Sequence, residues 1–210
     1  MTRRSAGFEG ESGPAHRVFL HRFEWFLMPR LHIFGASGSG ATTLGRDLAV
    51  RLGIAYFDSD DFLWLPTDPA YTRRRPDSER TAMLLHRLDP AGNWIFSGSA
   101  LGWGSVVEDR YNSLIFLHLD PRSRLQRLRQ REFQRFGTRI LPGGDMAEGH
   151  TEFITWAAEY DSGTPEGRSL VAHEAWMTQR RLPLLRLDSA APVDSLIAAA
   201  LAWLASLEQQ

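Results

Sequence analysis

The segment IFGASGSGATT, residues 33–43, has the composition of a loop that binds phosphate through its backbone. Its spacing, Gly35-x-x-x-x-Gly40-x-Thr42, matches the pattern G-x-x-x-x-G-K-[ST] except at the lysine position, which is Ala41. Glycine tolerates the positive φ angles that let successive N–H groups converge on an anion, and the start of a following helix favours negative charge. We therefore predict that phosphate binds here; the alternative is a glycine-rich turn that binds nothing.

The predicted ligand of this loop is ATP or GTP together with Mg²⁺, and the Thr42 hydroxyl is the expected metal ligand from the loop. All 24 basic residues of the chain are arginine, but a bias toward arginine would not place alanine at position 41. The residues expected to contact the nucleotide are Gly35, Ala36, Ser37, Gly38, Ser39, Gly40, Ala41, Thr42 and Thr43.

Three carboxylates follow the second predicted strand, in the segment YFDSDD. Asp58 and Asp60 are two residues apart and can point the same way from an extended chain. Because the carboxyl ends of parallel strands face the ligand crevice, we expect Asp58 to hold Mg²⁺ and Asp60 to orient an acceptor hydroxyl. Asp61 is a candidate cap of the next helix, and a solvated acidic turn is the alternative for the cluster.

Arginines recur along residues 121–136, where Arg124, Arg127, Arg131 and Arg135 fall on one face of a predicted helix. Guanidinium groups suit phosphate oxygens, although a run of this kind can also be a solvated basic face. A second cluster, residues 73–75, could bind an anionic acceptor such as a nucleoside monophosphate, or belong to a mobile surface loop.

Short apolar runs alternate with helical patterns from residue 31 onward. Strands are predicted at 31–34, 54–58, 93–98, 113–119 and 182–187, and helices at 42–52, 76–88, 121–136, 145–160, 165–179 and 192–207. This alternation predicts an α/β fold, in which helices cover both faces of a parallel sheet.

From residue 28 to its end the chain resembles the adenylate-kinase-like P-loop NTPases of bacteria, a group close to shikimate and nucleoside monophosphate kinases. The likeness lies in MPRLHIFGASGSGATTLGRDLAVRLGIAYFDSDDFLWLPTDPAY, SGSALGWG, REFQRFGTRILPGGDM and WAAEYD. It implies a three-layer P-loop kinase-like fold with five parallel strands in the order 2-3-1-4-5. The subgroup that it resembles often has Thr or Ser instead of the loop lysine, and Ala41 departs further by lacking even a hydroxyl.

The resemblance also implies roles for polar residues. Shikimate-kinase-like enzymes have a D-x-D that Asp58 and Asp60 match by position. The segment at about 121–145 corresponds to the lid, whose arginines close over the phosphates. Arg131, Arg135 and Arg139 are therefore candidates to supply the charge that Ala41 lacks. The third strand ends in Ser-Gly-Ser, without the aspartate frequent in nucleoside monophosphate kinases, which weakens a strict adenylate-kinase assignment.

Composition favours an ordinary globular protein, with 43% hydrophobic residues, a net charge of −1 and no cysteine. A thiolate metal site is excluded, nucleic acid is not an expected partner of a near-neutral chain, and no apolar run is long enough for a membrane span. We expect a cytoplasmic protein with a kinase-like domain at 28–210 and an N-terminal extension at 1–27. The extension is either loose or a helix that packs on the domain.

These observations predict a phosphotransferase that moves the γ-phosphate of ATP to a small, anionic acceptor. The acceptor is expected to be a nucleoside monophosphate or a hydroxylated metabolite. The alternative is a nucleotide-binding sensor with little or no turnover, because the loop lacks its lysine. The retained carboxylates and arginines favour the enzyme, whereas Ala41 favours the sensor.

Overall fold

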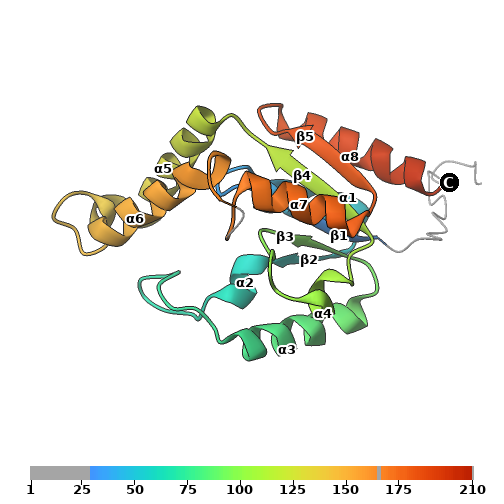
Figure 1. Cartoon of the computed structure of the whole chain (residues 1–210), viewed down its shortest axis with the longest axis horizontal. Helices are drawn as coiled ribbons and strands as arrows, with labels where there is room; N and C mark the ends of the chain where they lie inside the picture. The colour runs from blue at the N-terminus through green and yellow to red at the C-terminus, as the bar shows by residue number, and fades with distance from the viewer. Residues whose placement is uncertain (1–28, 165–166, 210) are drawn as a thin grey trace, which may run out of the picture.

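A five-stranded parallel sheet forms the centre of the molecule (Figure 1). The computed structural model describes residues 29–164 and 167–209, so the predicted extension at 1–27 lies outside the described residues. The strands lie in the order β2-β3-β1-β4-β5, and each neighbouring pair is parallel, which confirms the predicted fold and strand order. Their bounds are β1 (Arg30–Gly35), β2 (Ala55–Asp58), β3 (Trp94–Ser97), β4 (Ser113–His118) and β5 (Leu184–Asp188).

Helices connect the strands as the alternating sequence pattern predicts. The α-helices are α1 (Ala41–Leu52), α2 (Ser59–Leu63), α3 (Asp77–Leu88), α4 (Ser105–Glu108), α5 (Pro121–Phe136), α6 (Ala147–Ala158), α7 (Leu170–Arg180) and α8 (Val193–Leu207). Short 3-10 turns are η1 (Asp89–Ala91), η2 (Gly137–Ile140) and η3 (Glu159–Asp161). The two short helices, α2 and α4, are not predicted from the sequence because one or two turns are too short to show a helical period.

The helix predicted at 165–179 begins later, at α7. Its N-cap is Ser169, whose hydroxyl accepts a hydrogen bond from the backbone N–H of Ala172 at 3.1 Å. Residues 165 and 166 lie outside the described part of the chain. The cap fixes the end of the segment that carries Arg168, one residue before it.

The two faces of the sheet have different cores. α1 and α8 pack on one face, where the buried side chains are mainly aliphatic, such as Leu44, Leu48 and Leu204. The opposite core is rich in aromatic residues and takes side chains from α3, α4 and α7, including Trp176. Apolar burial on both faces explains why the central strands read as continuous hydrophobic runs.

Two histidines are buried in the aromatic core. His32 stacks against Phe34 and Tyr111, with ring centroids 4.8 and 4.5 Å apart. His173 lies 2.7 Å from the Tyr160 hydroxyl, through Nδ1. Burial lowers the pKa of each histidine to about 3, so both are neutral at physiological pH.

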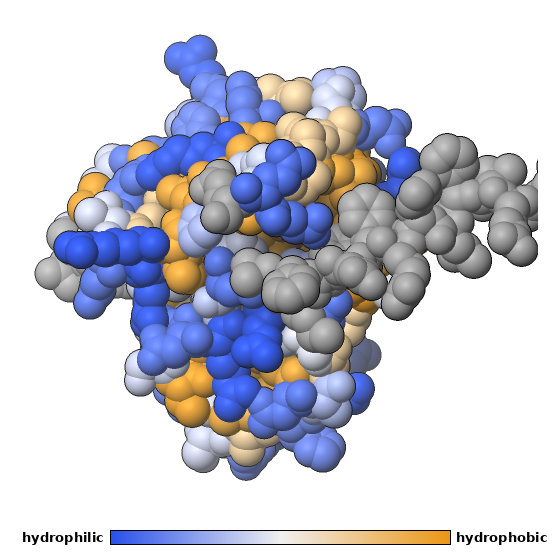
Figure 2. Space-filling view, turned by 90° about the vertical axis from the view of Figure 1, so that its right-hand side faces the viewer, coloured by the Kyte–Doolittle hydropathy of each residue, from blue (hydrophilic) through white to orange (hydrophobic). Residues whose placement is uncertain are grey.

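α5 and α6 extend away from the sheet on the left of Figure 1, beyond the carboxyl end of β4. Figure 2 views the molecule from the right of Figure 1, and hydrophilic and hydrophobic residues are interspersed over that face. Within residues 29–164 and 167–209, no helix combines the length and the apolar character that a membrane crossing requires.

Candidate functional site

The loop between β1 and α1 has the backbone geometry that its sequence predicts. Gly38 and Gly40 have φ angles of 86° and 93°, in the region that favours glycine. Gly35 is required for a different reason, because a Cβ atom there would lie 2.4 Å from the carbonyl oxygen of Leu117 on β4. Gly40 precedes α1 and no side chain caps this helix end, so its first N–H groups remain available to an anion.

A cleft of about 2090 Å³ opens over this loop, at the carboxyl edge of the sheet. Its lining includes loop residues 36–43, both predicted carboxylates, and Arg131 and Arg135 from α5. Gly35 and Arg139 do not line it. The structure therefore brings together most of the residues that the sequence singles out, although they come from three separate segments.

Asp58 lies at the end of β2 and is buried. Its Oδ1 accepts a hydrogen bond from the backbone N–H of Asp60 at 3.0 Å, which makes Asp58 the N-cap of α2. Its Oδ2 accepts a hydrogen bond from the Tyr56 hydroxyl, also at 3.0 Å. The prediction that Asp61 caps the helix is wrong, because α2 starts directly at Ser59 and Asp61 already belongs to its first turn.

Asp60 stands in the first turn of α2 and lines the cleft. Desolvation by the surrounding protein atoms is the main cause that raises the pKa of Asp60, and the negative charge of Asp58 is the second. The positive charges of Arg168 and Arg131 lower it. A carboxylate with a raised pKa is a better proton acceptor than an ordinary aspartate, which suits contact with a hydroxyl group.

The residues of the site are compatible with a magnesium nucleotide, although they could not hold a metal ion by themselves. Among the residues that the structure describes, no group of three or more His, Cys, Asp or Glu side chains is placed to bind one. Mg²⁺ in nucleotide sites takes one or two protein ligands and completes its shell with phosphates and water. The Ser39 hydroxyl, buried in the loop without a partner among the described residues, is a further donor that a phosphate could satisfy.

The three arginines predicted to act from the lid are each close to a carboxylate. Arg131 donates two hydrogen bonds to Glu132, at 2.8 and 3.0 Å, and Arg135 lies 3.7 Å from the same carboxylate. Arg139 forms a two-pronged pair with Asp145, with a shortest contact of 2.7 Å. In this structure their charges are therefore partly neutralised by neighbours.

Arg124 does not project from α5 with the other arginines, which corrects the predicted face. It is 1% exposed, and its guanidinium donates to the Ala157 carbonyl at 2.9 Å and to Asp161 at 2.5 Å. A longer hydrogen bond of 3.4 Å reaches the carbonyl of Ser37 in the loop. Arg124 is therefore buried because the end of α6 and η3 pack over it.

Arg168 is the site residue that sequence reasoning missed. Its Nη2 donates to the carbonyl of Gly35 at 2.6 Å, and its Nη1 donates to the Ser37 hydroxyl at 3.2 Å. The side chain lines the cleft, and burial lowers the pKa of its guanidinium. It lies just before α7, and no spacing pattern could have linked it to loop residues that are 131 and 133 positions earlier.

Aromatic rings and further arginines from residues 64–103 also line the cleft. Arg80 is buried, stacks over Trp103 with its Cζ 4.2 Å from the ring centroid, and pairs with Asp77 at 2.7 Å. Its Nε is buried without a partner among the described residues. Of the predicted cluster at 73–75, Arg74 lines the cleft, whereas Arg75 donates to two backbone carbonyls and is structural.

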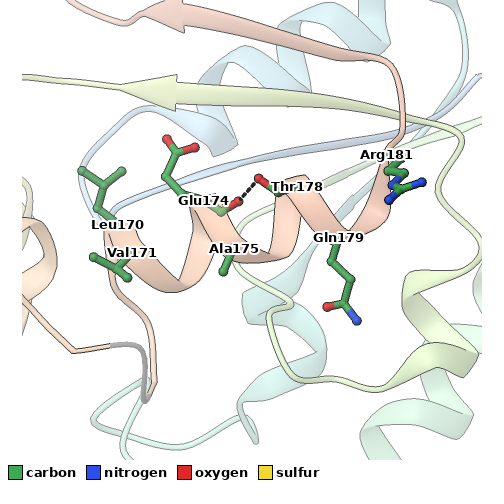
Figure 3. Close-up of a pocket in the computed structure, with 7 residues that line it drawn as sticks. All are labelled: Leu170, Val171, Glu174, Ala175, Thr178, Gln179 and Arg181. Atoms are coloured by element: carbon green, nitrogen blue, oxygen red, sulfur yellow. Dashed lines mark hydrogen bonds between the residues drawn. The ribbon is translucent and has the colours of Figure 1, made fainter.

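A second hollow, of about 1070 Å³, runs along α7 (Figure 3). Its one carboxylate belongs to Glu174, which is already paired with Arg186 at 2.6 Å. The Thr178 hydroxyl within it donates to the backbone carbonyl of Glu174. Because these groups are engaged with one another, the larger cleft is the candidate site. The residues lining the second hollow are Leu170, Val171, Glu174, Ala175, Thr178, Gln179 and Arg181.

Known proteins resemble the chain in sequence and in fold. No family model matches it. YqaC of Bacillus subtilis (strain 168), an uncharacterized protein, is 37% identical over 180 residues, a match that covers 86% of this chain and 99% of YqaC.

Two solved structures give the comparison of folds. A gluconokinase from Sinorhizobium meliloti 1021 is 17% identical with a TM-score of 0.50, and covers 86% of this chain and 93% of its own. A shikimate kinase from Bacteroides thetaiotaomicron is 20% identical with a TM-score of 0.47, over 87% and 99%. At these identities the likeness concerns the fold alone, and the gluconokinase, with the higher TM-score, is the structure that supports it. With its sheet order and its phosphate loop, the chain has a P-loop kinase-like fold and belongs to the same family as YqaC.

Proposed function

We propose that the protein is a phosphotransferase that moves the γ-phosphate of ATP, or of GTP, to a small anionic acceptor. A nucleoside monophosphate and a small hydroxylated metabolite are the two acceptor classes that fit. The observation that carries the proposal is that the phosphate loop and Asp60 line one cleft, so that a donor and an acceptor can meet there. Catalysis in such a site consists mainly of positioning and of charge stabilisation.

The donor phosphates would lie over residues 36–43, where the N–H groups at the start of α1 are uncapped. Thr42 and Asp58 would hold Mg²⁺, in the second case directly or through water. When bound, the ion would neutralise charge on the β- and γ-phosphates. The lid arginines Arg131, Arg135 and Arg139 would exchange their carboxylate partners for phosphate oxygens as the α5–α6 region closes.

Transfer forms a bond between an acceptor oxygen and the γ-phosphorus, and breaks the bond from that phosphorus to the β–γ bridging oxygen. The leaving group is ADP or GDP. For a hydroxyl acceptor, Asp60 is the group that orients the hydroxyl and takes its proton, in keeping with its raised pKa.

Acceptor recognition would use the arginines and aromatic rings of residues 64–103 that line the cleft. Arg80 has a buried Nε without a partner among the described residues, and Arg74 lines the cleft above the Trp64 ring at 5.6 Å. Guanidinium groups backed by indole rings fit a small molecule that combines an anionic group with a flat or apolar face. This chemistry favours an anionic acceptor over a neutral sugar.

The test is formation of ADP or GDP by the purified protein from Mg·ATP or Mg·GTP, with a panel of nucleoside monophosphates and hydroxylated metabolites. With an alcohol acceptor, we expect Asp60→Asn to reduce turnover by roughly 100-fold or more while nucleotide binding is retained. The matched control is Asp61→Asn, which changes the next carboxylate in the same helix and lies outside the cleft lining.

Two results would contradict the proposal. Tight nucleotide binding with no turnover on any acceptor would favour the nucleotide sensor. Equal loss of turnover in the Asp60 and Asp61 variants would show that the local acidic charge, and not Asp60 itself, is what matters.

A further inference from the structure

Arg168 places a guanidinium directly against a phosphate loop that has no lysine. Its two contacts, with the carbonyl of Gly35 and the hydroxyl of Ser37, lie at the start of the loop. Neither of these partners carries a charge, so the contacts fix the guanidinium without neutralising it. The loop therefore has a guanidinium beside it that is not neutralised by a direct ion pair, from a segment far away in the sequence.

The other arginines near the loop are different in this respect. Arg124 also reaches Ser37, but Asp161 lies 2.5 Å from it. Arg131 is bonded to Glu132. Within the described ranges 29–164 and 167–209, no carboxylate lies within ion-pair distance of Arg168, whose other contact is with the Trp156 ring at 5.9 Å.

The same side chain has an unused donor. The Nε of Arg168 is buried and makes no hydrogen bond to any residue that the structure describes. Asp60 is near enough to favour the charge of Arg168, but it lies beyond ion-pair distance. Holding a charged group away from water without a directly paired opposite charge costs free energy, and so does leaving a donor unpaired. A bound anion would remove both costs, because a phosphate group offers charge and acceptor oxygens together.

We propose that Arg168 is the cation of the phosphate loop, which binds the polyphosphate of the nucleotide and takes the role that a lysine at position 41 would have. This inference rests on the proposed nucleotide site and adds to it a residue outside the predicted lid set. It also explains why alanine is suitable at position 41. A lysine there would bring a second cation toward a guanidinium that is already partly desolvated.

The test measures binding and not only turnover. Isothermal titration calorimetry would give the affinities of Mg·ATP, Mg·ADP and adenosine for the wild type, Arg168→Met, Arg168→Lys, Ala41→Lys and the double variant Ala41→Lys/Arg168→Met. We expect Arg168→Met to weaken Mg·ATP binding by roughly 10- to 100-fold, with little change for adenosine. Arg168→Lys keeps the charge and should lose less.

The double variant distinguishes two roles for Arg168: a source of positive charge for the nucleotide, and a structural support of the loop. If Arg168 supplies charge, Ala41→Lys should restore most of the lost Mg·ATP affinity in the Arg168→Met protein, yet give the wild type no more than about a threefold gain. A purely structural role would weaken adenosine and ATP equally and would not respond to the new lysine. The control substitution is Arg129→Met, on the exposed part of α5.

Three outcomes would overturn the inference. They are unchanged Mg·ATP binding by folded Arg168→Met, failure of the lysine to restore binding, and a large gain in affinity from Ala41→Lys in the wild type. The affinity of the single variant Ala41→Lys tests the inference even if Arg168→Met fails to fold. Failure of the proposed function is distinguishable, because it would appear as wild-type nucleotide binding without transfer; a wild type that binds no nucleotide would overturn both.

Discussion

The arginines that contact the phosphate loop differ from those of the predicted lid in how deeply they are buried. Arg124 and Arg168 are buried or half-buried and donate to backbone carbonyls and a hydroxyl of the loop or of neighbouring segments, and Arg124 also donates to Asp161. Arg131, Arg135 and Arg139 are partly exposed and pair with carboxylates. The first group is held by buried contacts, whereas we expect the second group to exchange one anion for another.

This difference has energetic consequences. The exposed pair between Arg139 and Asp145 is weak and screened by salt, so Arg139 costs little to separate from its carboxylate. Arg131 and Arg135 share the buried Glu132 carboxylate, so their separation from it costs more. Arg124 is buried with the Asp161 carboxylate and should respond to mutation mainly through folding. Arg168 and the predicted lid arginines should respond mainly through ligand affinity.

The largest expected effect comes from Arg124→Met. This change removes the bonds to Asp161 and to the Ala157 carbonyl, and leaves both acceptors partly buried without a donor. We expect a loss of about 3 kcal/mol in the free energy of unfolding, measured by urea denaturation at pH 7. Arg129→Met, on the exposed side of the same helix, should change the free energy of unfolding little. Equal effects of the two substitutions would contradict the distinction between buried and exposed arginines.

A smaller effect is expected from the histidines of the aromatic core that lies behind the loop. Their folded-state pKa values of about 3 are below the ordinary 6.5, so the unfolded chain takes up protons first as the pH falls. The stability due to each neutral histidine is therefore complete above pH 6.5 and is lost as the pH falls toward 3. At pH 5 the loss should be about 2 kcal/mol for each histidine.

The check is the difference in unfolding free energy between pH 7 and pH 5. For His173→Gln, this difference should be about 2 kcal/mol smaller than for the wild type, because one titrating group has been removed. His86→Gln, on the exposed side of α3, is the control and should leave the pH dependence as it is. An unchanged pH dependence in His173→Gln would mean that this histidine is not held neutral by the fold.

The smallest effect is expected from the carboxylate partners of Arg139 in the predicted lid. Asp145→Asn removes the main partner of Arg139 and should leave the thermal midpoint unchanged. If Arg139 exchanges Asp145 for phosphate, Mg·ATP affinity should rise by about threefold at low salt and less at high salt. Asp68→Asn, which removes the longer 3.3 Å contact with the same arginine, is the weaker comparison. A fall in affinity would place Arg139 outside the nucleotide site.

The fold was predictable because its signals are local. The apolar strands, the amphipathic helices and the loop spacing each lie within a short window, and the family resemblance added the strand order. The positions of Asp58 and Asp60 at the sheet edge followed from the same alternation, since carboxyl ends of parallel strands share one edge.

The roles of individual side chains were harder to predict because they depend on distant partners. Helical spacing put Arg124 on a face with the other arginines, but Asp161 and the Ala157 carbonyl, which bury it, come more than 30 residues later. Asp58 proved to cap α2, a helix too short for its period to be recognised. Arg168 reaches Gly35 only through the packing of α7 on the sheet, which no sequence window contains.

The hydrogen bonds of Asp58 limit what this carboxylate can offer an ion. A carboxylate has about four lone-pair positions. The Asp60 N–H occupies one on Oδ1 and the Tyr56 hydroxyl one on Oδ2, while the Ser97 hydroxyl, 2.6 Å from that of Tyr56, can donate to Tyr56. Each oxygen therefore already accepts one hydrogen bond. A cation at this edge would thus gain a single oxygen from Asp58 and would keep much of its own water. That arrangement matches a small, firmly hydrated ion such as Mg²⁺, and it disfavours Ca²⁺, which requires six to eight oxygens.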